Sequence, residues 1–134
     1  MTLEEVNVEA ARKFIDLYNR GPDYIDLSHS KDVQWVELPF LGPAGRSGGF
    51  EFLKEMAISA WEKCPDRKIQ IRKIVGQSDT VVIECEWTGT LREVLELEKR
   101  SLNMGDVLKF DILFFLKYQD QKIIQQVDYC TLTT

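Results

Sequence analysis

The sequence lacks most of the features that mark metal-binding, membrane and secreted proteins. It has one histidine, His29, and three widely separated cysteines, Cys64, Cys85 and Cys130. Their spacing matches no zinc or haem motif, so no metal is expected and the thiols are predicted to be reduced and mostly buried. No apolar run approaches the roughly 20 residues that span a bilayer, and the acidic first residues are unlike a signal peptide. These absences predict a cytoplasmic protein.

A basic stripe is also missing. The 134 residues carry a net charge of −5, with Lys and Arg scattered along the chain. Nucleic-acid binding needs clustered cations that displace counterions from phosphates, and docking on an anionic membrane needs them as well. We therefore expect no nucleic acid and no membrane as partners. A hydrophobic fraction of 44% and a charged fraction of 29% are ordinary for one soluble globular domain, expected to cover residues 1–134.

The first half of the chain has the periodicity of helices. Thr2 and Glu5 fit a capping box, and the apolar stripe that follows them should end near Gly21. Three further elements are predicted here: a short helical piece over 24–28, a strand over 33–38 and a helix over 50–61.

The second half has mainly the pattern of strands. They are predicted over 68–75, 80–90, 107–118 and 122–131, with residues 91–105 as a long hairpin loop or a short helix. The second of these strands alternates cleanly between an apolar side, which includes Cys85 and Trp87, and a more polar side, which includes Glu84 and Glu86. One face of the sheet should therefore be buried and the other wet.

This order of elements occurs with Asp-Val-Gln-Trp-Val-Glu-Leu-Pro at 32–39, Glu-Trp-Thr-Gly-Thr at 86–90 and Val-Asp-Tyr at 127–129. Over nearly its whole length the chain resembles the SnoaL-like branch of the nuclear transport factor 2-like superfamily. The resemblance implies an α+β fold, in which a curved antiparallel sheet, shaped as a cone or half-barrel, is closed by N-terminal and middle helices around a pocket. The superfamily includes polyketide cyclases, ketosteroid isomerase, limonene epoxide hydrolase, dehydratases and domains that only bind or dimerise, so it predicts the fold better than the chemistry.

The family's catalytic residues carry over poorly. Where ketosteroid isomerase has a tyrosine on its first helix this chain has Phe14, and where it has its catalytic aspartate before a proline this chain has Leu38. Limonene epoxide hydrolase has an arginine and an aspartate two residues apart on a middle strand, at the positions of Cys85 and Trp87. Its Asp-Tyr near the C-terminus does match Asp128 and the residue after it. The resemblance therefore leaves Asp128 as the one family acid.

The register of the last hairpin decides which side chains share a face with Asp128. A three-residue loop over 119–121 would pair Tyr118 with Lys122 and Ile112 with Asp128, and cross-strand partners share a face. A two-residue loop would shift the register by one residue. The mostly apolar face is assigned to the pocket, and it comprises Phe110, Ile112, Phe114, Leu116, Ile124, Gln126, Asp128 and Cys130.

Asp128 is the predicted catalytic residue. Apolar surroundings deprive its charged form of hydration, which raises the pKa of the carboxyl and suits a general acid or base near neutral pH. The alternative is a structural aspartate bonded to Tyr18 or to a backbone N–H, without turnover. Asp111, the other unusual acid, is assigned to the outer face beside Lys109 and Tyr129.

Aromatic residues are the candidates for binding an apolar ligand, although such a stripe is more often plain core. Trp87 is favoured because it lies on the apolar side of its strand. Trp35 is disfavoured because Gln34, Val36 and Leu38 are taken as the inward set, and His29, in an expected loop, is given no role. The predicted binding residues are Tyr18, Phe14, Trp61, Trp87, Phe114 and Gln126.

The leading functional hypothesis is a cofactor-independent isomerase, cyclase, dehydratase or hydrolase. It would use one pocket carboxylate on a small apolar or aromatic, oxygenated molecule. The alternative is a non-catalytic ligand-binding or dimerisation module with the same pocket. A homodimer is expected in either case, because Leu113, Phe115 and Val127 would leave an apolar outer face wet in a monomer.

Overall fold

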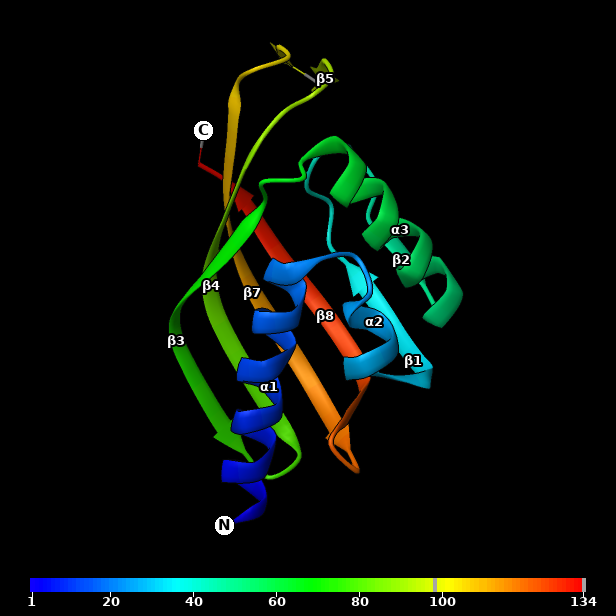
Figure 1. Ribbon diagram of the computed structural model, residues 1–134, viewed down its shortest axis with the longest axis vertical. Helices are drawn as coiled ribbons and strands as arrows, with labels where there is room; N and C mark the ends of the chain where they lie inside the picture. The colour runs from blue at the N-terminus through cyan, green and yellow to red at the C-terminus, as the bar shows by residue number, and fades with distance from the viewer. Residues whose placement is uncertain (98, 134) are drawn as a thin grey trace.

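The computed structural model of the protein describes residues 1–97 and 99–133, and three helices cover one face of a curved sheet (Figure 1). The strand order is β2-β1-β8-β7-β4-β3, which confirms the predicted α+β class. The sheet is mixed and not wholly antiparallel as expected, since β1 runs parallel to β8. The elements are α1 (Leu3–Arg20), α2 (Tyr24–Ser28), β1 (His29–Glu37), β2 (Arg46–Gly48), α3 (Phe50–Lys63), β3 (Lys68–Gln77), β4 (Thr80–Thr90), β5 (Leu95–Glu96), β6 (Ser101–Leu102), β7 (Val107–Gln119) and β8 (Lys122–Leu132).

Helix α1 begins and ends as its sequence predicts. The Thr2 hydroxyl accepts the backbone N–H of Glu5 at 3.2 Å, and the helix ends at Gly21. The helix lies against β3 and β4 (Figure 1). Its approach to β3 is so close that a Cβ at Gly76 would lie 2.7 Å from Cγ2 of Val8, so glycine is needed there.

Strand β1 starts four residues earlier than the predicted strand. Residues 29–32 are His-Ser-Lys-Asp, with no apolar alternation, and they extend because β1 pairs with β8 from His29 onward. A register shift separates the His29 pair from the Gln34 pair in this ladder. Strand β2 was missed for a similar reason, since Arg-Ser-Gly has no strand propensity and pairs only through β1.

The charged segment before β7 is a hairpin and not a helix. Its strands β5 and β6 form a separate two-stranded sheet. In Figure 1 this hairpin projects beyond the upper end of β4 and β7. Of the two predicted alternatives, the long hairpin loop is therefore correct.

The last hairpin differs in detail from its prediction. Gln119 pairs with Lys122, so the loop has two residues, and a bulge then places Lys117 opposite Gln125. Each feature shifts the register by one residue, and because the two shifts add, the faces of β8 beyond the bulge stay as predicted. Asp128 pairs with Phe114 and not with Ile112.

The two-residue loop reverses the predicted orientation at the start of β8, and the bulge at Ile124 restores it further along the strand. Ile123 is fully buried, whereas Ile124 is only partly buried, so the prediction that Ile124 faces inward is wrong. A bulge inserts one residue that has no cross-strand partner, and a pattern of alternation cannot reveal it.

The uncovered face of the sheet carries an apolar row. Val36 pairs with Val127, Val127 with Phe115, Phe115 with Val82, and Val82 with Val75. We call these five residues the outer apolar row. Phe115 is 44% exposed, so this row is not part of the core.

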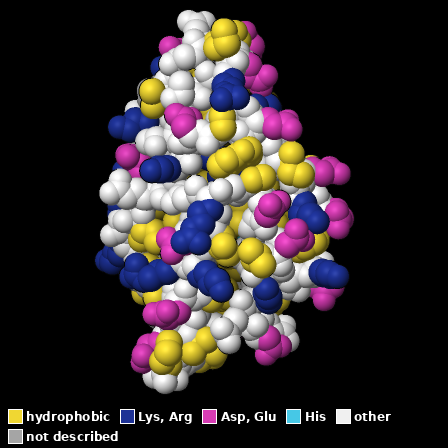
Figure 2. Space-filling view, in the orientation of Figure 1, with side chains coloured by type: hydrophobic (Ala, Val, Ile, Leu, Met, Phe, Trp, Pro, Cys, Tyr) yellow, Lys and Arg dark blue, Asp and Glu magenta, His cyan; other side chains and the backbone are white. Residues whose placement is uncertain are grey.

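The helical face of the molecule is mixed in character. Apolar side chains appear between basic and acidic ones, without a large single-sign field (Figure 2). Among the residues that the structure describes, no helix is both long enough and apolar enough to span a bilayer.

Candidate functional site

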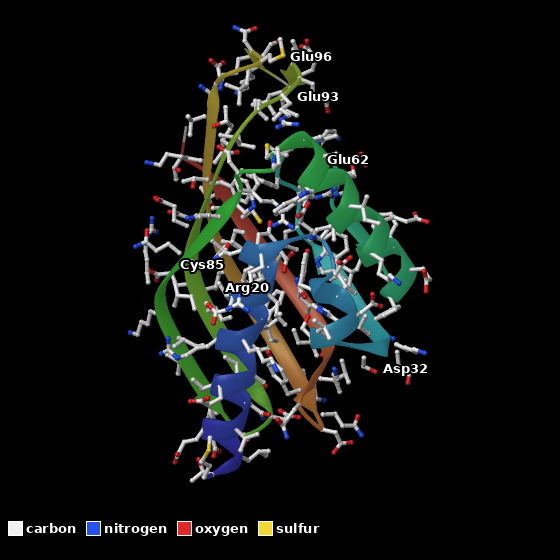
Figure 3. All side chains as sticks on the ribbon, in the orientation of Figure 1. Arg20, Asp32, Glu62, Cys85, Glu93 and Glu96 are labelled. Carbon is white, nitrogen blue, oxygen red and sulfur yellow. The ribbon has the colours of Figure 1, made fainter. Side chains whose placement is uncertain are left out.

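A cavity of about 260 Å³ lies between the inner face of the sheet and the helices. Its volume is slightly below the usual range of about 300–1,000 Å³ for small-molecule sites, so only a small ligand would fit. Five of the predicted binding residues, Phe14, Tyr18, Trp87, Phe114 and Gln126, line this cavity together with Asp128. In Figure 3 the labelled Cys85 lies on the sheet beside the end of α1 that carries Arg20, whereas Glu93 and Glu96 lie at the projecting hairpin. The cavity is therefore a helix-covered space with one carboxylate among aromatic walls.

Asp128 is buried at the cavity wall and is held by two hydrogen bonds. Its Oδ2 accepts the indole N–H of Trp35 at 2.9 Å, and its Oδ1 accepts the amide N–H of Gln126 at 2.9 Å. Burial raises the pKa of the Asp128 carboxyl to about 7, although both hydrogen bonds act in the opposite direction. The carboxyl can therefore gain or lose a proton near neutral pH.

Two charges at the cavity wall act on Asp128 as well. Glu37 raises the pKa of the Asp128 carboxyl and Arg46 lowers it. These two residues line the cavity and form an ion pair of 2.8 Å with each other. Because they pair, their influences on the carboxyl largely offset, and burial remains the dominant cause of its raised pKa.

Tyr18 supplies a hydroxyl to the same cavity. Its oxygen accepts the indole N–H of Trp87 at 2.6 Å, and Trp87 in turn stacks on Phe110 with ring centroids 4.6 Å apart. Burial raises the pKa of Tyr18 to about 12, so the hydroxyl keeps its proton at neutral pH. Among the described residues no acceptor is paired with that proton, which leaves it free to donate to an oxygen of a ligand.

Arg67 packs against Tyr18 and stabilises its position. Its guanidinium stacks over the Tyr18 ring at 3.9 Å and donates to the Tyr18 carbonyl at 2.9 Å. Trp61 packs against the same guanidinium at 5.1 Å and does not line the cavity. The predicted binding residue Trp61 therefore lies outside the lining of this cavity, where its ring covers Arg67.

Two residues that the sequence analysis set aside belong to the site. Trp35 is 2% exposed and contacts Asp128, so the inward set of β1 includes Trp35 and not Gln34, Val36 and Leu38. His29 is the first residue of β1, is 3% exposed and contacts Gln126 at 2.6 Å. The indole N–H of Trp35 was the available signal, since a buried tryptophan needs an acceptor.

Asp111 lies on the outer face, as its predicted register places it. The Arg72 guanidinium donates to Asp111 at 2.9 Å and to Glu86 at 2.8 Å. The Asp111 side chain is 41% exposed. It therefore has no access to the cavity and makes a natural control for Asp128.

A second pocket of about 630 Å³ also adjoins α1 and shares Phe14 with the first. It is lined by α1, the end of α2 and the turn between β7 and β8, and Phe14 and Ser28 are among its walls. Its charged walls are Glu9, Lys13, Asp120 and Lys122. Only the smaller cavity contains a buried carboxylate, so we place the candidate active site there.

Neither metal chemistry nor thiol chemistry has support among the described residues. They contain no group of three or more His, Cys, Asp or Glu side chains that could hold a metal ion. The three cysteines are free, and burial raises the pKa of Cys85 to about 12, which keeps that thiol protonated.

No family profile and no curated protein sequence matches the chain. The solved structures do match: AclR, a candidate hydroxylase from Streptomyces galilaeus, superposes with a TM-score of 0.78 at 14% identity, covering 97% of this chain and 81% of AclR. A candidate SnoaL-like polyketide cyclase from Jannaschia superposes with a TM-score of 0.74 at 14% identity, covering 97% of this chain and 88% of the cyclase. The chain has the SnoaL-like fold.

A third solved structure has a bound small molecule. It is a protein with a ketosteroid isomerase-like fold from Catenulispora acidiphila, in complex with trimethylamine. It superposes with a TM-score of 0.66 at 15% identity, covering 90% of this chain and 84% of that protein. Identities this low establish the fold alone, and they confirm the resemblance to the SnoaL-like branch of the nuclear transport factor 2-like superfamily at that level.

Proposed function

We propose that the chain is a cofactor-independent enzyme in which Asp128 moves a proton on a small, mostly apolar, oxygenated molecule. The observation that carries this proposal is a carboxyl with a pKa of about 7 in the wall of an aromatic cavity. A general acid or base is most effective when its pKa lies near the working pH. Solved structures of this fold include polyketide cyclase candidates and a trimethylamine complex, which support a small-molecule ligand.

Asp128, Tyr18 and Trp87 have different roles in the proposed reaction. The Asp128 carboxylate removes a proton from a carbon next to a carbonyl group, and the electron pair moves onto the carbonyl oxygen. The Tyr18 hydroxyl donates to that developing oxyanion, and the Trp87 N–H polarises the hydroxyl by donating to its oxygen. In a β,γ-unsaturated ketone the proton then returns from Asp128 to the γ-carbon, the double bond moves into conjugation and the carbonyl re-forms, which completes an isomerisation. In a molecule with a second carbonyl group the enolate carbon attacks that group, and the alkoxide that forms takes the proton from Asp128, which completes a cyclisation.

Isomerisation and cyclisation fit this site better than hydrolysis. Adding water across a bond requires polar groups that orient the water, and the walls around Asp128 are mainly apolar and aromatic. The apolar walls also exclude water, which protects an enolate from protonation by solvent. A dehydratase reaction would begin with the same proton abstraction and remains a chemical variant of the proposal.

The test uses exchange of α-protons for deuterium in D₂O with a panel of small cyclic ketones, followed by NMR. Wild-type protein should accelerate exchange. Asp128→Asn should reduce the rate by at least about a hundredfold, the usual contribution of one general acid or base. Asp111→Asn is the matched control on the neighbouring strand and should leave the rate unchanged, because its side chain bonds Arg72 on the outer face.

Ligand binding separates the proposal from its alternative, a non-catalytic binding module. Trp35 and Trp87 line the cavity, so quenching of tryptophan fluorescence reports occupancy. Asp128→Asn should still bind the ketone that exchanges fastest in the wild type. If wild type and Asp128→Asn bind ligands equally and neither exchanges protons, the binding module is the correct reading.

We also propose that the chain forms a homodimer through its outer face. The outer apolar row crosses five adjacent strands, and Val36, Phe115 and Val75 are 41%, 44% and 51% exposed. A continuous apolar row of this kind is typical of an interface. Sedimentation at micromolar concentration should give twice the 15.6 kDa of one chain, and Phe115→Glu should reduce it to one. A wild-type mass of one chain at that concentration would rule the dimer out.

A further inference from the structure

A continuous line of hydrogen bonds runs from Asp128 away from the cavity. The Gln126 amide contacts Asp128 Oδ1 at 2.9 Å through its nitrogen and His29 Nε2 at 2.6 Å through its oxygen. On the other side of the imidazole, Nδ1 lies 2.8 Å from the Ser28 hydroxyl, which lies 2.6 Å from the Tyr24 carbonyl. All the side chains in this line are buried, so a ring nitrogen, amide oxygen or hydroxyl without a partner would be costly here.

The imidazole of His29 is neutral through the physiological pH range. Burial lowers its pKa to about 4, and the nearby charge of Lys122 acts in the same direction. The edge-on ring of Phe14, with centroids 5.4 Å apart, helps to exclude water. A neutral imidazole has one N–H, so one ring nitrogen donates and the other accepts.

When Asp128 is ionised, one arrangement of donors and acceptors pairs the groups of this line. The carboxylate accepts the Gln126 N–H, the Gln126 oxygen accepts an N–H from His29 Nε2, and Nδ1 accepts the Ser28 hydroxyl proton. The hydroxyl has only one proton, so its short contact with the Tyr24 carbonyl goes unused in this arrangement.

When Asp128 is protonated, the same groups are paired by hydrogen bonds that run in the opposite direction. The carboxyl proton is donated to the Gln126 oxygen, which requires the amide to turn over, and the amide N–H is then donated to His29 Nε2. The proton of the imidazole now sits on Nδ1 and is donated to Ser28, whose hydroxyl donates to the Tyr24 carbonyl. The position of Ser28 within reach of both groups is what permits both arrangements.

We propose that His29 is a positioning residue for Asp128, acting through Gln126, and that its neutral ring changes tautomer whenever Asp128 gains or loses a proton. The functional meaning rests on the proposed role of Asp128 as acid and base. The neutral ring offers a donor to one amide orientation and an acceptor to the other. Both protonation states of the carboxyl therefore exist without an unpaired buried amide, whose presence would disfavour one state.

The other ionisable groups around the line do not interfere with this change. Glu37 and Arg46 face Asp128 from β1 and β2 and pair with each other, and Lys122 faces His29 from β8. Burial raises the pKa of the four remaining neighbours, which stay neutral at physiological pH: Tyr18, Tyr24, Cys85 and Cys130. Asp128 is therefore the group of this network whose own ionisation drives the change.

The experiment is ¹⁵N NMR of the imidazole between pH 5 and 9, and it needs no substrate. His29 is the single histidine of the chain, so both imidazole resonances belong to it, and Nε2 is distinguished from Nδ1 by its coupling to both ring C–H protons. The protonated nitrogen should change from Nδ1 at low pH to Nε2 at high pH, with the midpoint of the Asp128 titration. The same tautomer on both sides of that midpoint, or an imidazole that becomes charged within the range, would overturn the proposal.

Two variants make the test specific. Asp128→Asn should abolish the pH-dependent exchange of the two nitrogens, and a change that persists in this variant contradicts the proposal. Gln126→Leu should uncouple the ring, so that the Asp128 carboxyl still titrates while the tautomer no longer follows it. A tautomer that follows Asp128 in a protein that exchanges no α-protons would refute the proposed activity and leave the role of His29 intact. A tautomer that stays the same in a protein that does exchange α-protons would refute the role of His29 and leave the proposed activity intact.

Discussion

The two faces of the sheet each present an aspartate on neighbouring strands, in opposite surroundings. Asp128 on β8 faces inward and bonds only uncharged donors, the indole of Trp35 and the amide of Gln126. Asp111 on β7 faces outward, where Arg72 neutralises it in contact with water. The contrast shows that the side of the sheet, and not the residue type, decides whether an aspartate here is buried among uncharged donors or exposed beside a cation.

The adjacent residues Phe114 and Phe115 give the largest expected difference in stability between the two faces of the sheet. Phe114 is 4% exposed and lines the cavity, whereas Phe115 is 44% exposed in the outer apolar row. Phe114→Ala should lower the free energy of unfolding by about 3–5 kcal/mol, as expected for a buried aromatic side chain. Phe115→Ala should lower it by less than about 1 kcal/mol per folded chain. Urea unfolding of both variants measures the difference.

The dependence of these stability losses on protein concentration tests whether Phe115 lies in a dimer interface. Because dimerisation stabilises the folded state by mass action, the small effect of Phe115→Ala should grow as the concentration rises through the dimerisation range. The effect of Phe114→Ala should not depend on concentration. Equal losses in the two variants at every concentration would show that the two faces do not differ as described.

The pH dependence of stability gives a smaller effect, because two buried groups oppose each other. The folded state binds more protons than the unfolded state at Asp128 between about pH 4 and 7, so this residue makes stability fall as the pH rises. At His29 the unfolded state binds more protons between about pH 4 and 6.5, so this residue makes stability rise over nearly the same range. The two contributions nearly cancel in the wild type.

Asp128→Asn should therefore expose the contribution of His29. Relative to wild type, the variant should gain about 3 kcal/mol of stability as the pH rises from 4 to 6.5, which is one proton over that range. Glu4 and Asp66, whose lowered pKa values also make stability rise with pH, are common to both proteins and drop out of the difference. Parallel curves for the two proteins would show that Asp128 has no raised pKa.

Much of the fold could be predicted from the sequence because its signals are local. The cap at Thr2, the stop at Gly21 and the alternation of β4 each act within a few residues, and the structure reproduces all three. Strand β2 and the first residues of β1 could not be predicted, because residues 29–32 and 46–48 become strands only by pairing with distant partners.

The candidate site was predictable in part, for a different reason. Asp128 and Gln126 follow from the alternation of β8, and their inward direction survives because two register shifts add. Trp35 was set aside because the orientation of β1 was taken to be the opposite one, and nothing in the local sequence fixes that orientation. His29 was set aside because it was expected in a loop before the strand. The hydrogen bond between Gln126 and His29 joins residues 97 positions apart, and only the fold brings them together.

The most direct measurement of the central claim is the pKa of the Asp128 carboxyl by ¹³C NMR, with Asp128→Asn used to assign the resonance. The side chain is buried among apolar walls and bonded to neutral donors, so its titration midpoint should lie near 7. Substitution of Asp111 on the other face should not move that midpoint. A midpoint at or below the ordinary aspartate value of about 3.9 would contradict the account, because the carboxyl would then be ionised throughout the physiological range.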